Sequence, residues 1–256
     1  MERIVVFRFH RDPEVCRSRL RLLRQLNPGV PIYGLGERIG LEGEFEDLHV
    51  IDDRDAEWKW KNGDLALARW FRAVGHEVDF DVAHVVEWDL LLCAPLSELY
   101  GHVPPDALAL SGLRSMDAAR EDGWSWIDDE GSYQHADDYR QVREWAARRF
   151  GFEGEGPSCI FPGAALPRSF LVEHAALDPP AVSNDEVRVP LAATALGYDL
   201  YDTGFHDWTD AGRRYFNGRG TEVPPSRVAA ELADPDGRRA FHPVYEPIDP
   251  DEVPNP

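Results

Sequence analysis

The sequence contains few cysteines and no long apolar run. Its three cysteines, Cys16, Cys93 and Cys159, are odd in number and far apart, which argues against a disulfide framework or a thiolate zinc site. No apolar run approaches the roughly 18 residues that a membrane-spanning helix requires, and the opening stretch Met1 to Phe9 lacks a signal-peptide pattern. We therefore expect a soluble, cytoplasmic protein without a transmembrane segment.

Positive charge is also scarce. The 256 residues include 27 Lys and Arg against 47 Asp and Glu, a net charge of −20, and only Lys59 and Lys61 are lysines. Nucleic acids and anionic membrane surfaces are bound mainly through basic side chains, so this balance argues against both as partners. In contrast, 43% hydrophobic residues, with 8 Trp and 12 Phe, suffice for a sizeable core and argue against disorder.

Strand and helix signals alternate through the first ninety residues. The β-branched and aromatic run Arg3 to Phe9 predicts a buried strand, and Asp12-Pro13 predicts the start of a helix. Further strands are expected at 30–33, 47–51 and 83–87, with a helix beginning near Asn62 and ending at Gly75. This order predicts an α/β fold with a largely parallel sheet.

The second half has weaker signals and no clear linker. We expect strands at 106–113 and 198–201, helices at 137–150, 167–177 and 185–196, and a Gly-rich loop at 151–158. The Pro-rich tail from Pro243 is expected to run over the surface. A single domain is predicted for 1–256, with a nucleotide-binding half near 1–93, an acceptor and catalytic half near 94–245, and a tail at 246–256.

Two carboxylates stand where an apolar strand ends, in Val85-Val86-Glu87-Trp88-Asp89. At the carboxyl edge of a sheet, where α/β folds bind ligands, such oxygens can hold a divalent cation. A cation there would let an acidic protein bind a diphosphate. On the residues alone, this short pattern is also that of ordinary strand-end acids, and only its context favours a metal site.

Several segments together resemble the GT-A class of nucleotide-sugar glycosyltransferases, in particular its family-2-like group. They occur in the order of that class over roughly residues 3–245. The segments are Phe9-His10, Lys61-Asn62-Gly63-Asp64 with Ala68-Arg69, Glu87-Trp88-Asp89, Phe161-Pro162-Gly163-Ala164 with Arg168, Asp185-Glu186 eleven residues before Gly197, and Phe241-His242-Pro243.

The resemblance implies a GT-A-like, Rossmann-type mixed sheet with flanking helices. It also implies transfer of a sugar from a nucleotide-sugar donor to an acceptor hydroxyl with inversion, where the acceptor is a glycan, a lipid-linked molecule or a small molecule. In this reading Asp89, Glu87 and His242 hold Mn²⁺ or Mg²⁺, and Glu186 or Asp185 is the base. The donor-binding residues implied are Phe9, His10, Glu37, Asn62, Arg69, Gly163 and Arg168.

Some residues depart from this pattern or have simpler explanations. The second strand ends at Gly36-Glu37, so Glu37 and the later Asp52-Asp53 are the only acids there to contact a nucleoside. Acids such as Asp185 also occur at helix starts merely as caps. Trp58, Trp60, Trp124, Trp126 and Trp208 lie in polar contexts, where indole rings stack on sugars or fill the core. A catalytically inactive GT-A-like binding protein and a sugar nucleotidyltransferase stay open as alternatives.

Overall fold

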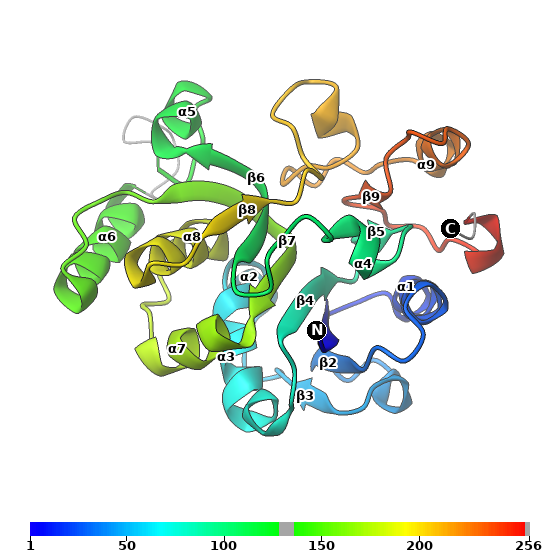
Figure 1. The fold of residues 1–256 in the computed structure, drawn as a ribbon, viewed down its shortest axis with the longest axis horizontal. Coiled ribbons are helices and arrows are strands. Elements are labelled where there is room, and N and C mark those ends of the chain that lie inside the picture. Colours follow the sequence, from blue (N-terminus) through cyan, green and yellow to red (C-terminus); the bar gives the residue numbers. More distant parts are fainter. Residues whose placement is uncertain (128–135, 254–256) are drawn as a thin grey trace.

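The computed structural model describes residues 1–127 and 136–253. Its main sheet has seven strands in the order β3-β2-β1-β4-β7-β6-β8 (Figure 1). The strands are β1 Arg3–Phe9, β2 Ile32–Gly36, β3 Leu48–Val50, β4 Val82–Glu87, β6 Leu108–Ser115, β7 Pro157–Pro167 and β8 Leu200–Asp202. β7 runs antiparallel to both of its neighbours and the other pairs are parallel, so the sheet is mixed, consistent with the expected GT-A-like Rossmann-type class.

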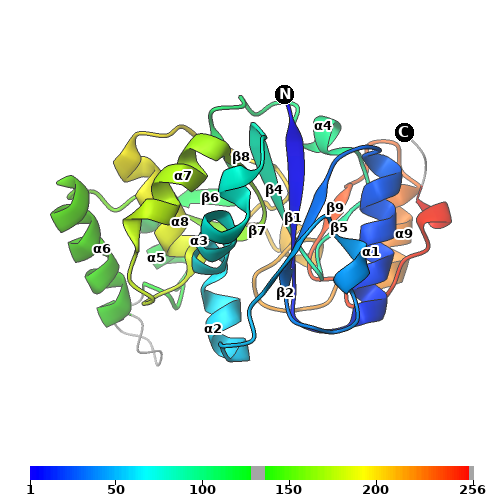
Figure 2. The same ribbon diagram turned by 90° about the horizontal axis from the view of Figure 1, so that it is seen from below.

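Helices cover both faces of this sheet (Figure 2). α3, α7 and α8 pack on one face around residues such as Val6 and Val85, while α1 packs on the other around Phe7 and Val86. The described helices are α1 Pro13–Leu26, α2 Ala56–Lys61, α3 Gly63–Ala73, α4 Leu96–Leu99, α5 Met116–Glu121, α6 Ala136–Phe150, α7 Arg168–Leu177, α8 Asp185–Leu196 and α9 Pro225–Leu232. None of the described helices is long and apolar enough to span a membrane.

Local sequence signals explain the first βα unit. Alternate side chains of β1 enter the two cores, which requires apolar residues on both faces of the strand. α1 begins as expected, since the Asp12 side chain accepts a hydrogen bond from the Val15 N–H and Pro13 occupies the first turn. Its apolar positions, Cys16 and Leu20 among them, are fully buried.

Two expectations from the sequence are wrong. The segment Phe161-Pro162-Gly163-Ala164, which the resemblance matches to a small-residue loop facing the donor sugar and acceptor, is instead the middle of β7, which is buried and pairs with β4 and β6. The chain after Pro243 does not simply run over the surface, because Val244, Ile248 and Val253 are buried against α1 and α9. A short sheet of β5 Leu91–Leu92 and β9 Ala240–Phe241 anchors this segment. Of the expected tail, 254–256 lie outside the described residues.

A buried ion pair joins α8 to α3. The Arg188 guanidinium donates to both carboxylate oxygens of Asp64, at 3.0 and 2.6 Å, and also to the carbonyl oxygens of Val182 and Lys61. Burial opposes ionisation of Asp64, but Arg188 outweighs it and lowers the pKa of that carboxyl. This pair fixes the first turn of α8, where Asp185 and Glu186 lie, against the start of α3.

Replacement of this guanidinium is expected to destabilise the protein strongly. Arg188→Met leaves the Asp64 carboxylate buried without its cation, which typically costs about 3–5 kcal/mol in the free energy of unfolding. Denaturant titration measures this change. Arg140→Met is the matched control, because Arg140 pairs with Asp137 and Glu144 on the exposed side of α6, and such pairs contribute about 0–1 kcal/mol. Equal effects in the two variants would show that the Arg188 pair does not stabilise the fold.

Candidate functional site

The carboxyl end of β4 brings Asp89 next to His242. Leu91 of β5 pairs with Phe241 of β9 in an antiparallel register, and the Val244 N–H donates to the Asp89 carbonyl oxygen. As a result His242 Nε2 lies 3.5 Å from Asp89 Oδ1. The juxtaposition that the resemblance required between these residues is present.

The geometry of this pair suits a shared cation. The His242 Nδ1 atom lies 2.8 Å from the Asn217 carbonyl oxygen, which can only accept, so Nδ1 carries the hydrogen and Nε2 faces Asp89. Asp89 Oδ1 is buried and has no hydrogen-bond partner in the described part of the chain. Burial raises the pKa of Asp89, but His242 outweighs this and lowers it, so the carboxylate stays ionised.

The protein itself supplies few metal-ligating side chains beside Asp89 and His242. Within residues 1–127 and 136–253, no group of three or more His, Cys, Asp or Glu side chains is arranged to hold a metal ion. Mg²⁺ and similar cations are commonly held by one or two carboxylates together with substrate phosphates and waters. Asp89 and His242 therefore fit a cation that arrives with a diphosphate.

Glu87 is engaged by an arginine that the sequence analysis did not single out. Arg8, in β1, donates through Nη1 to Glu87 Oε1 at 2.5 Å, and the same nitrogen lies 3.9 Å from Asp185 Oδ2. Asp185 also accepts the Gly63 N–H at 3.0 Å. Burial raises the pKa values of both Glu87 and Asp185. Arg8 could have been flagged, because a charged residue within a buried strand must find a partner.

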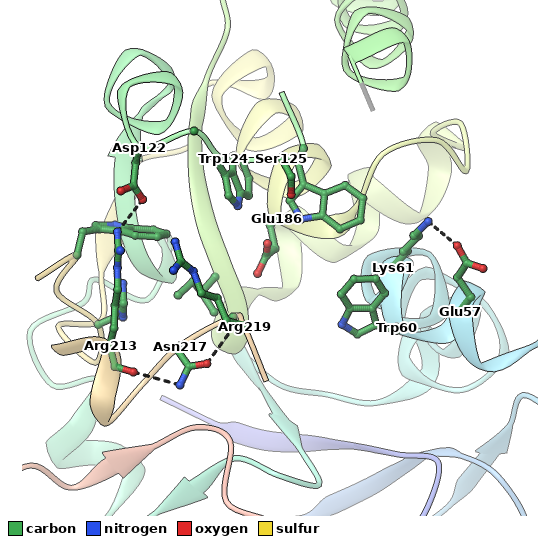
Figure 3. A pocket seen from close by; sticks show the side chains of 16 residues that line it. Glu57, Trp60, Lys61, Asp122, Trp124, Ser125, Glu186, Arg213, Asn217 and Arg219 are labelled. Atoms are coloured by element: carbon green, nitrogen blue, oxygen red, sulfur yellow. Dashed lines mark hydrogen bonds and ion pairs between the residues drawn. The ribbon is translucent and has the colours of Figure 1, made fainter. Parts of the chain in front are cut away.

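Glu186 is placed differently from its neighbour Asp185. Its Oε2 atom accepts from the Asn184 side chain at 3.1 Å, and the residue lines two cavities. Figure 3 shows it in the middle of a cavity, with Arg219 on one side and Trp60 on the other. Burial raises the pKa of Glu186 to about 7, which is suited to taking up a proton near neutral pH.

A cavity of about 240 Å³, here called the carboxylate cavity, is lined by half of the predicted site residues. Its lining includes Glu87, Asp89, Asp185, Glu186, His242 and His10. Arg11 and Lys61 also face it, and Arg11 lies over the Trp88 ring at 4.7 Å. Four acids and several cations thus converge where β1 and β4 end.

Other predicted donor-binding residues lie elsewhere. Phe9 lines a small adjoining cavity of about 40 Å³, which it shares with His10 and with Lys59, the partner of Glu37. The Asn62 side-chain amide is occupied by other parts of the protein. It donates to the Trp58 carbonyl oxygen and accepts from the Arg188 guanidinium.

The two arginines among the predicted donor-binding residues, Arg69 and Arg168, do not line the carboxylate cavity. Arg69 pairs with Asp53, and Arg168 donates to the carbonyl oxygens of His76 and Val78 at the opposite end of the sheet. Gly163, within β7, presents its carbonyl oxygen to the Tyr100 hydroxyl and does not line the carboxylate cavity. Arg11 and Lys61 occupy the place that the sequence analysis gave to Arg69 and Arg168.

A larger cavity of about 620 Å³ adjoins the first one and shares six lining residues with it: Trp60, Lys61, Trp126, Ile160, Glu186 and Gly218. We call it the tryptophan cavity, because four indole rings line it: Trp60, Trp124, Trp126 and Trp208. The Trp60 and Trp126 rings are 5.7 Å apart, and Trp60 is 60% exposed. Glu186 therefore stands between a charged cavity and an aromatic one.

Two comparisons with known proteins give no match. No protein-family model matches the chain. No curated protein matches it either.

Solved glycosyltransferase structures show a distant similarity. The apo form of the glycosyltransferase GlyE of Streptococcus pneumoniae TIGR4 is 14% identical, with a TM-score of 0.37, over 79% of this chain and 45% of that one. The apo bifunctional glycosyltransferase WbbM is 11% identical, with a TM-score of 0.46, over 96% of this chain and 46% of that one. The chain spans less than half the length of either structure.

Proposed function

We propose that this protein is a glycosyltransferase that moves a sugar from a nucleotide-sugar donor to an acceptor hydroxyl. The observation that carries the proposal is the position of Glu186, a carboxylate with a pKa of about 7 on the wall between the carboxylate cavity and the tryptophan cavity. A base at such a boundary can act on a hydroxyl held in one cavity while the donor sugar enters from the other.

The carboxylate cavity is the proposed donor site. Asp89 and His242 would hold Mn²⁺ or Mg²⁺, which would stabilise the negative charge that develops on the departing diphosphate. Arg11 and Lys61 supply positive charge at the same cavity. Arg8 keeps Glu87 and Asp185 in place, so the acids of this cavity are not all free to repel a phosphate.

Glu186 is the proposed general base. Its carboxylate would accept the proton of the acceptor hydroxyl as the oxygen attacks the anomeric carbon and the nucleoside diphosphate leaves. Attack from the side opposite the diphosphate gives inversion. Asp185 is the weaker candidate, because its carboxylate is buried and already accepts the Gly63 N–H.

Binding and turnover measurements test this function. UDP, GDP and their sugars are titrated into the whole chain with and without Mn²⁺, and donor hydrolysis and transfer to a broad acceptor panel are followed. Metal-dependent binding together with slow donor hydrolysis or transfer is the expected result. Binding without any turnover would instead favour an inactive nucleotide-binding protein, and absence of nucleotide binding would refute both.

A further inference from the structure

Among the arginine and lysine side chains that line the tryptophan cavity, Arg219 differs in its pairing with the described residues. Arg213 pairs with Asp122 at 2.6 Å, and Lys61 pairs with Glu57 at 2.6 Å. The Arg219 guanidinium, in contrast, makes no ion pair within the described part of the chain. Figure 3 shows it directed into the cavity, near Glu186. Arg219 is exposed, so an anion that enters the cavity from solvent can reach its guanidinium.

The remainder of the lining mixes flat aromatic surface with polar groups. The four indole rings are interleaved with the side chains of Ser125, Asp122 and Glu57. A wholly apolar occupant would remove these polar groups from water without giving them hydrogen bonds, which is unfavourable. A saccharide suits both the aromatic and the polar side chains of this lining. Its C–H faces can lie on the indole rings while its hydroxyls form hydrogen bonds with the polar groups. The volume of about 620 Å³ is within the usual range for small-ligand sites.

We propose that the tryptophan cavity binds an anionic saccharide as the acceptor, with Arg219 pairing with its carboxylate or phosphoryl group. This deepens the proposed function and rests on it, since Glu186 would deprotonate a hydroxyl of this saccharide. A guanidinium matches both anions, because its planar N–H groups form two parallel charge-assisted hydrogen bonds. In this proposal the indole rings stack on the sugar rings, and Arg219 favours saccharides that carry an anionic group.

A panel of matched oligosaccharides tests the selection directly. Calorimetry on the whole chain compares oligosaccharides that contain a hexuronic acid with their methyl esters, and phosphorylated oligosaccharides with their dephosphorylated parents. We expect the acidic member of at least one pair to bind about 10- to 100-fold more tightly, the usual range for a hydrogen bond to a charged group. Equal binding of acidic and neutral members, or no saccharide binding at all, overturns the proposal.

Two variants assign the selection to this cavity. Arg219→Gln is expected to abolish the preference for the acidic member, whereas Arg214→Gln, an exposed arginine outside the cavity, leaves it unchanged. Trp124→Leu is expected to weaken binding of acidic and neutral members alike, and Trp145→Leu, which packs on Phe150 away from the cavity, is its control. An unchanged preference in Arg219→Gln refutes the role of Arg219.

Separate readouts distinguish this inference from the proposed function. Nucleotide binding and donor hydrolysis concern the carboxylate cavity and need no acceptor, so both are measured on the unmodified protein without any saccharide present. If saccharides bind with the expected preference but no nucleotide sugar is bound or hydrolysed, the transferase proposal fails. If donor hydrolysis is normal and no saccharide binds, the saccharide proposal fails alone.

Discussion

Glu186→Gln is expected to bind the nucleotide-sugar donor normally and to lose sugar transfer by about 10²- to 10⁴-fold, the usual contribution of a general base. The amide has nearly the same shape as the carboxylate but cannot accept the proton of the acceptor hydroxyl. Steady-state transfer rates and donor affinity, measured on the same preparation, check the two parts of this expectation.

The control for this variant is Glu57→Gln. Glu57 lines the same cavity but pairs with Lys61 at its outer edge, so its replacement removes a negative charge nearby without removing the base. We expect only a small change in rate. If Glu186→Gln retained transfer at the level of Glu57→Gln, Glu186 would not be the base.

The dependence of transfer on pH provides an independent check. Burial raises the pKa of Glu186 to about 7, and only the deprotonated form can accept a proton. The transfer rate should therefore fall as the pH decreases below about 7 and level off above it. The residual transfer rate of Glu186→Gln should not show this decrease at acidic pH. A rate that rises towards acidic pH would contradict the assignment.

The central sheet and the carboxylate edge were predictable from local patterns. The apolar runs of β1 and β4 and the cap at Asp12 determine where the first strands and α1 form, and Glu87 and Asp89 follow directly from the end of β4. β7 was missed because it contains Pro162 and Gly163, which are uncommon inside strands. Its pairing with β4 and β6 outweighs that local preference.

The long-range contacts of the site could not be derived from local patterns. The buried Arg8 joins Glu87 to Asp185, two residues nearly a hundred positions apart in the chain. The tryptophan cavity draws its rings from three distant segments, around Trp60, Trp124 and Trp208. Neither arrangement produces a repeating pattern in the sequence, because each depends on how the sheet brings separate loops together. The meeting of Asp89 and His242 was expected only through the resemblance, and β5–β9 pairing provides its physical basis.

Asp89→Asn is expected to reduce the Mn²⁺-dependent affinity for a nucleoside diphosphate by at least about 100-fold. Loss of groups that merely orient metal ligands already costs about 10- to 100-fold, and this change removes the charge of a ligand itself. The Asp89 Oδ1 atom is buried, has no hydrogen-bond partner among the described residues and lies 3.5 Å from His242 Nε2, so no neighbouring acid can replace it without moving. Calorimetric titration of UDP and GDP, with and without Mn²⁺, measures the loss.

Two further variants locate the effect of Asp89. Glu87→Gln should reduce the Mn²⁺-dependent affinity much less, because Glu87 Oε1 already accepts from Arg8 and is turned to that partner rather than to a cation. Asp52→Asn, an exposed acid outside the carboxylate cavity, should leave the affinity unchanged. A larger loss in Glu87→Gln than in Asp89→Asn would transfer the ligand role to Glu87, and the Arg8 pair would then have to open whenever the donor binds. Metal-independent binding of equal strength in all the variants would mean that Arg11 and Lys61 alone neutralise the diphosphate.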